Sequence, residues 1–188
     1  MLNIFNSNTT VCAGVKELGE GSRGHVRGLH EGLLSAVSVG FFLVLVGALF
    51  IATPDLLHDV VTFFSHFNVY TVNATNVQIP APENLGAYVD VYLAAREFSL
   101  VWGVFLIAML GTRFLVGSPL RRKAENVGGI VFWLGATYLI ETFLVVPAQT
   151  GVIDVTGWFE FWALIVALIG VSLIARAILV ATVRAINK

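Results

Sequence analysis

The sequence predicts an all-α integral membrane protein: a bundle of four transmembrane helices, with an amphipathic interfacial helix in the first outer loop. Its composition, the length of four apolar segments and the placement of its positive charges predict this fold. Of the 188 residues, 57% are hydrophobic and 12% are charged, and the mean hydropathy is +0.84. Soluble domains carry roughly 25% charged residues, so this chain has too few polar groups to cover a surface in water. Lipid is the solvent that such a composition suits.

Four segments are long and apolar enough to cross a bilayer. A spanning helix needs about 20 apolar residues, and such a run must be helical because lipid offers no hydrogen-bond partners to the backbone. The predicted spans are about 32–53, 98–116, 127–146 and 158–182, with Pro54 ending the first and Pro147 the third. They define a transmembrane domain over 32–182, with outer loop 54–97, an N-terminal segment 1–31 and a tail 183–188.

The positive charges predict the orientation of the spans. Cytoplasmic loops are enriched in Lys and Arg, and only Arg96 of the eleven Lys and Arg residues falls on the other side of a four-span arrangement. We therefore expect a multi-pass protein of the cell membrane with both termini in the cytoplasm. The remaining ten are Lys16, Arg23, Arg27, Arg113, Arg121, Arg122, Lys123, Arg176, Arg184 and Lys188.

The segments outside the spans have their own patterns. Residues 15–33 have the pattern of a short amphipathic helix on the cytoplasmic face, although several glycines weaken it. In the outer loop, residues 55–67 have polar and apolar faces at the spacing of an interfacial helix. Residues 69–82 are expected to be extended or irregular, and a helix is expected to begin near Asn84. Asn73 heads an Asn-Ala-Thr sequon, a candidate glycosylation site. The polar face of the loop helix is Asp55, His58, Asp59, Thr62, Ser65 and His66, and its apolar face is Leu56, Leu57, Val60, Val61, Phe64 and Phe67.

Four ionisable residues at the outer ends of the spans form a candidate intramembrane polar or ion site: Arg96, Glu97, Glu141 and Glu160. Ionisable groups inside spans are costly and are often functional. One interpretation is an ion or proton site, or a ring at a pore mouth. The other, which we favour, is that Arg96 pairs with Glu141 to hold the bundle together while the other glutamates reach interfacial water.

The basic residues at the inner ends of the spans are candidate contacts for anionic lipid: Arg113, Arg121, Arg122, Lys123 and Arg176. For Arg113 and Arg176, extension of the side chain toward the headgroups is the simpler interpretation. Glu97 precedes Arg113 by the same sixteen residues as Glu160 precedes Arg176. This repeat has two explanations, duplication of a helical hairpin or topology alone, because sixteen helical residues rise about 24 Å. We favour topology.

The sequence offers no enzyme motif, and we expect no metal, no cofactor and no nucleic-acid partner. A single cysteine, Cys12, excludes an internal disulfide, and the net charge is −1. His58 and His66 share a helical face but lie about 12 Å apart along it, too far for one metal ion. We expect a non-enzymatic scaffold or small subunit of a membrane complex, with the lipid bilayer and copies of itself or other membrane subunits as partners. The alternatives are an oligomeric ion channel or transporter with an acidic outer mouth and, third, a membrane redox subunit that uses these histidines.

Overall fold

The computed structural model describes residues 32–71, 78–115 and 120–186. The expected amphipathic segment before residue 32 and the sequon residue Asn73 lie outside these ranges. The chain divides into two compact units, Met1–Leu43 and Val44–Lys188, and the boundary falls inside its first described helix, Gly32–Ala52. The second unit contains every other described element.

The described chain is mostly helical, and four of its helices are long and apolar enough to cross a membrane. These helices confirm the four predicted apolar segments; the last three begin before their predicted limits, and the third also continues past its predicted end. The four-helix bundle itself stays a prediction. The four candidate spans are Gly32–Ala52, Leu85–Leu115, Arg122–Thr150 and Val155–Thr182.

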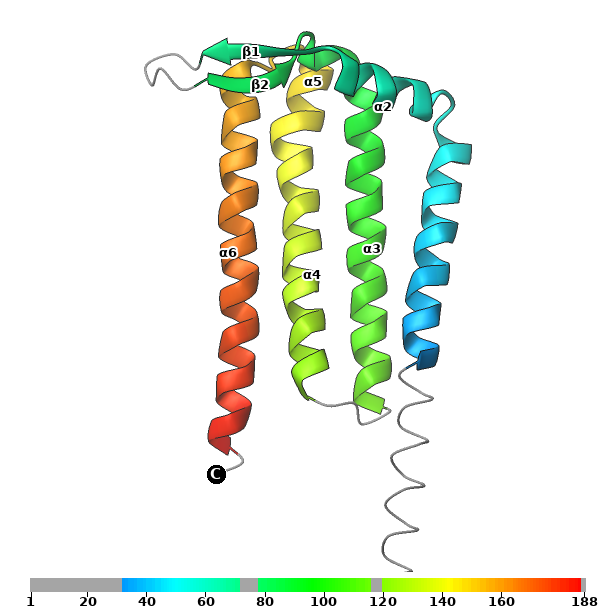
Figure 1. The fold of residues 1–188 in the computed structure, drawn as a ribbon, viewed down its shortest axis with the longest axis vertical. Coiled ribbons are helices and arrows are strands. Elements are labelled where there is room, and N and C mark those ends of the chain that lie inside the picture. The colour runs from blue at the N-terminus through cyan, green and yellow to red at the C-terminus, as the bar shows by residue number, and fades with distance from the viewer. Residues whose placement is uncertain (1–31, 72–77, 116–119, 187–188) are drawn as a thin grey trace, which may run out of the picture. The chain divides into compact units, whose positions relative to one another are not determined.

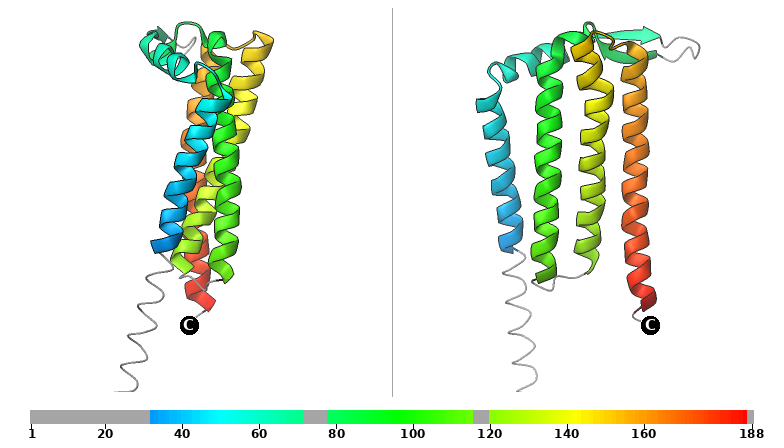
Figure 2. Two further views of the ribbon diagram at one scale, coloured as in Figure 1. Left: turned by 90° about the vertical axis from the view of Figure 1, so that its right-hand side faces the viewer. Right: turned by 180° about the vertical axis from the view of Figure 1, so that it is seen from behind.

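Within the second unit, α4 (Leu120–Ile140) lies between α3 (Val89–Leu115) and α6 (Val155–Ile186) (Figure 1). The view from behind shows the same order (Figure 2). Glycines on these helices allow the close packing: a Cβ added at Gly128 of α4 would lie 3.2 Å from the carbonyl oxygen of Ser172 on α6. Small residues let helix backbones approach closely, so α4 is fitted to its neighbour at this level.

The predicted end of the third span at Pro147 is wrong. After Ile140 the helix passes through a π-helical turn, Glu141–Val145, and continues as α5 (Val146–Thr150) to Gly151. Proline has no N–H and its ring crowds the preceding turn. The wider π turn accommodates it, because the Val146 N–H donates to the Glu141 carbonyl five residues back. The helix ends where Gly151 takes a left-handed φ of 70°, a conformation that glycine adopts without steric cost.

The segment between the first helix and α3 contains a helix and a hairpin. The helix predicted there is present as α2 (Leu56–Ser65), and its interfacial position stays a prediction. It is followed by two antiparallel strands, β1 (Phe67–Thr71) and β2 (Gln78–Pro82), and by a 3-10 turn, Leu85–Tyr88, that leads into α3. The strands confirm the expected extended backbone, and they correct the all-α expectation. The two prolines of β2 are tolerated because both strands of a two-stranded sheet are edges.

The best-packed part of the unit lies beneath α2 and the hairpin. Phe63 of α2 is only 7% exposed and its ring packs edge-on against Phe67, Tyr88 and Tyr92. The predicted apolar face omitted Phe63 and included Phe64, which is 69% exposed. The helix therefore presents two apolar stripes, one buried in the protein and one open. The open stripe consists of Leu57, Val61 and Phe64.

Candidate functional site

Two of the predicted polar residues meet between α3 and α4. The Arg96 guanidinium donates through Nη1 to Glu141 Oε2 over 2.8 Å. Arg96 comes from the first third of α3, and Glu141 is the first residue of the π-helical turn. Their side chains are 29% and 41% exposed, so the ion pair is partly covered by the two helices that it joins.

A second carboxylate approaches the same guanidinium. Glu97 Oε1 lies 3.7 Å from Arg96 Nη2, a looser contact than that of Glu141. The fourth predicted member, Glu160, is exposed on α6 and takes no part in this cluster. One arginine thus faces two carboxylates, which is an arrangement suited to joining helices rather than a ring of unpaired acids.

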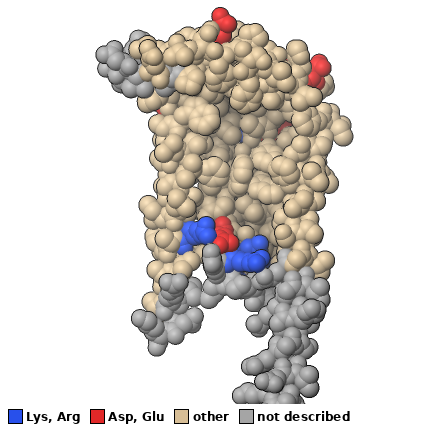
Figure 3. Space-filling model, viewed as in Figure 1, with Lys and Arg blue, Asp and Glu red and all other residues tan. Residues whose placement is uncertain are grey.

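The basic residues meet at the opposite ends of the same helices, where Lys and Arg gather around an acid in the lower part of Figure 3. Arg176 Nη2 of α6 donates to Glu125 Oε1 of α4 over 2.8 Å. Arg113 Nη1 donates to the carbonyl of Arg122 over 2.9 Å, and the Lys123 ammonium lies 4.3 Å from the centre of the Phe114 ring. The side chain of Arg121 is outside the described part, and lipid binding by this group stays a prediction.

Sequence reasoning missed Glu125 as a partner. Its charge at the start of the third apolar run, one helix away from Arg176, was the available signal, but the sequence does not say which helices are neighbours. With the neighbours known, α4 and the π-helical turn that continues it supply the acid to both 2.8 Å ion pairs. Glu125 of α4 pairs with Arg176 of α6 at one end, and Glu141 of the turn pairs with Arg96 of α3 at the other.

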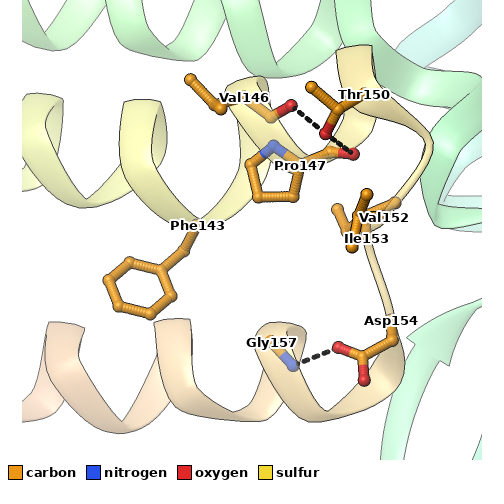
Figure 4. A pocket seen from close by; sticks show the side chains of 8 residues that line it. All are labelled: Phe143, Val146, Pro147, Thr150, Val152, Ile153, Asp154 and Gly157. Carbon is orange, nitrogen blue, oxygen red and sulfur yellow. Dashed lines mark hydrogen bonds between the residues drawn. The ribbon is translucent and has the colours of Figure 1, made fainter.

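A cavity of about 330 Å³ lies where α5 gives way to α6 (Figure 4). Its polar groups serve the helix ends: Thr150 Oγ1 donates to the Val146 carbonyl at 2.9 Å, and the Gly157 N–H donates to Asp154 Oδ1 at 2.8 Å. The second bond is an N-terminal cap, in which a carboxylate satisfies a free amide of the first helical turn. These hydrogen bonds are structural, and they leave the cavity without a nucleophile and base aimed at each other.

A larger groove, which we call the aromatic groove, lies beneath α2 and the hairpin. Its volume is about 710 Å³. Side chains of α3 and α6 form its walls, Ile140 and Leu144 lie between them, and Phe63, Phe64 and Phe67 close one end. None of the described residues that line it is charged, so the groove is separate from the Arg96 cluster in chemistry.

Within the described residues, no group of three or more His, Cys, Asp and Glu side chains is placed to hold a metal ion. Of the two outer-loop histidines, His66 makes a 3.0 Å hydrogen bond through Nδ1 with the Thr62 carbonyl of its own helix. Comparison of the chain with protein-family models, curated proteins and solved structures found no match.

Proposed function

We propose that this chain is a non-enzymatic, multi-pass membrane protein that assembles with copies of itself or with other membrane subunits. Membrane residence is supported by the four apolar helices and by the small part of their surface that is buried within the protein. None of the most apolar part of Val155–Thr182 is buried within the protein. A face of this kind needs lipid or another protein against it.

The observation that carries assembly is Gly170 on α6. Some glycines in the helices face a neighbour within the chain: a Cβ at Gly135 would lie 2.5 Å from Leu168, and one at Gly103 would lie 2.7 Å from Leu134. Others, among them Gly111 on α3 and Gly170 on α6, have open space beside them. A Cβ at Gly170 would meet nothing within 4 Å. Glycine costs a helix about 1 kcal/mol relative to alanine, and close approach of another helix is the usual compensation in membranes.

The ion pairs support a structural interpretation of the charged groups. Glu141 and Arg176, which the sequence marks as unusual within apolar runs, each have a partner on a neighbouring helix at 2.8 Å. In a scaffold, such pairs fix the order of the helices. The charge distribution supports placement in the cell membrane with both termini cytoplasmic.

Membrane residence is tested by washing isolated membranes with alkaline carbonate. A multi-pass protein stays in the pellet, and a protein released into the supernatant would contradict the proposal. Assembly is tested by measuring the mass of the purified protein in mild detergent, for the wild type and for Gly170→Leu. We expect a complex whose dissociation constant rises about tenfold in the variant, equivalent to about 1.4 kcal/mol of lost packing.

The matched control is Val171→Phe. Val171 is exposed on α6 next to Gly170 but points to a different side of the helix. Added volume there should leave the assembly unchanged. A monodisperse wild-type monomer, with no partner recovered by crosslinking, would contradict the scaffold proposal.

A second candidate is an oligomeric channel or transporter with an acidic outer mouth, and one observation favours it. Glu141 begins a π-helical turn, and such turns are frequent at functional sites. Ion flux into liposomes tests this candidate with wild type and Glu141→Gln. Flux that the substitution abolishes would favour the channel, and absent or unchanged flux would remove Glu141 from such a role.

A further inference from the structure

The aromatic groove has the dimensions of a ligand site. Its volume is about 710 Å³, and sites for small molecules have volumes of about 300–1,000 Å³. Val91, Tyr92 and Ala95 form the α3 side, and Trp158 and Trp162 are among the residues on the α6 side. The lining comes from segments far apart in the chain, so the fold has to be complete before the groove exists.

The lining has little to offer a polar ligand. The Tyr92 hydroxyl donates to the Leu85 carbonyl at 3.0 Å, and the Trp158 indole N–H donates to the Pro80 carbonyl at 3.2 Å. These two polar atoms are therefore used to hold the hairpin and the 3-10 turn in place, and the exposed Trp162 indole N–H is the remaining aromatic donor in the described lining. A polar molecule entering the groove would lose most of its hydrogen bonds to water without replacement, whereas a hydrocarbon chain loses none.

The groove is also preformed at its closed end. Phe63 packs against Trp158 with ring centroids 6.1 Å apart, and Trp158 packs against Trp162 at 5.6 Å. Phe63 and Trp158 are both nearly fully buried. Rigid aromatic walls reduce the entropy lost when a ligand binds.

We propose that the aromatic groove holds the hydrocarbon chain of a bilayer phospholipid, with the chain passing between α3 and α6 beneath the roof of Phe63, Phe64 and Phe67. This inference depends on the membrane residence proposed above. Lipid is favoured over other occupants because the lining residues of α3, α4 and α6 belong to three of the helices that are apolar and long enough to span a membrane. The acyl chains around those helices are the nearest source of an apolar occupant.

The test fills the groove with larger side chains and measures how much phospholipid the protein retains. Ala95 and Ala163 line it and are exposed, so the double variant Ala95→Phe/Ala163→Phe adds volume there without disturbing the core. Ala108→Phe is the control, because Ala108 is exposed on α3 outside the lining. The chains are taken from carbonate-washed membranes, purified in mild detergent and examined by native mass spectrometry for bound phospholipid.

We expect the wild type and Ala108→Phe to retain phospholipid. The double variant should bind it about tenfold more weakly, the effect of excluding about two methylene groups from the groove. A wild type that stays in washed membranes yet retains no lipid would overturn the groove and leave the proposed function standing. Release by the carbonate wash would contradict membrane residence itself. Self-association of delipidated wild type that Ala95→Phe alone prevents would assign the groove to a second copy, and would also overturn the inference, because Ala95 lines the groove from α3 and is not on the Gly170 face of α6.

A second measurement does not require the Ala95→Phe/Ala163→Phe variant to fold. In Trp102→Phe/Trp133→Phe, the remaining tryptophans are Trp158 and Trp162, both of which line the groove. Phospholipid with brominated acyl chains, added to the delipidated protein in detergent, should quench their fluorescence saturably, and unbrominated phospholipid should reverse the quenching. Quenching that rises linearly without saturation, or that is not reversed by competition, would overturn the proposal.

Discussion

The Arg96 guanidinium of α3 donates a 2.8 Å hydrogen bond to the Glu141 carboxylate where α4 enters its π-helical turn. The pair joins the two helices near the hairpin, and Glu125 with Arg176 joins α4 to α6 at the far end. Glu125 of α4 and Glu141 of the π-helical turn that continues it supply the two carboxylates, so one pair fixes α3 and the other fixes α6 as a neighbour of this helix.

Replacing Arg96 with Met should lower the free energy of unfolding. The substitution leaves Glu141 and Glu97 without their cation, and loss of a partly exposed ion pair costs up to about 1 kcal/mol. Unfolding by SDS from mixed micelles measures the loss, with exposed Glu160→Gln as the unaffected control. A double-mutant cycle with Glu141→Met isolates the pair, and a coupling energy of zero would refute its structural role.

Gly128→Val should separate α4 from α6. A Cβ at Gly128 already lies 3.2 Å from the Ser172 carbonyl oxygen, and backbone cannot move aside as a flexible side chain can. Overpacking of this kind costs about 1–3 kcal/mol, and the displacement should also lengthen the nearby Arg176–Glu125 pair. Thermal unfolding in detergent measures the effect. Gly111→Val, at a glycine with open space beside it, is the control, and equal losses in the two variants would contradict close packing at Gly128.

Deleting Thr142 should be tolerated better than deleting Val131. Thr142 is an exposed residue within the π-helical turn, so its loss can convert the wide turn into ordinary α-helix while the residues on either side keep their faces. Val131 lies in regular α-helix, where removing one residue rotates everything beyond it by about 100°. The yield and thermal stability of monodisperse protein compare the two, and equal damage would count against this account of the turn.

Alanine substitution of the adjacent Phe63 and Phe64 of α2 should lower the free energy of unfolding by different amounts. Phe63→Ala removes a buried ring from the core and should cost about 3 kcal/mol of stability. Phe64→Ala removes a ring that is 69% exposed and should cost under about 0.5 kcal/mol, as is usual for surface substitutions. Chemical or thermal unfolding of the two variants measures this difference. Similar losses would show that α2 is rotated relative to the arrangement described here.

Local composition was enough to predict the four apolar helices, because a long apolar run in lipid has few alternatives to the helix. It was not enough for Pro147, where the rule that proline ends a helix failed because a π turn absorbs the missing N–H and the ring. The Arg96–Glu141 contact could be predicted because both residues lie at a similar depth near the outer ends of their spans. The Arg176–Glu125 contact and the burial of Phe63 did not, because both depend on which elements are neighbours, and a pattern within one segment carries no such information.

Cysteine crosslinking in native membranes tests the central claim, assembly through α6, most directly. In a Cys12→Ser background, Gly170→Cys should form an oxidised dimer of twice the 20.3 kDa chain. Val171→Cys, one residue along, should crosslink far less. Absence of dimer from Gly170→Cys, or equal crosslinking at both positions, would contradict assembly through this face.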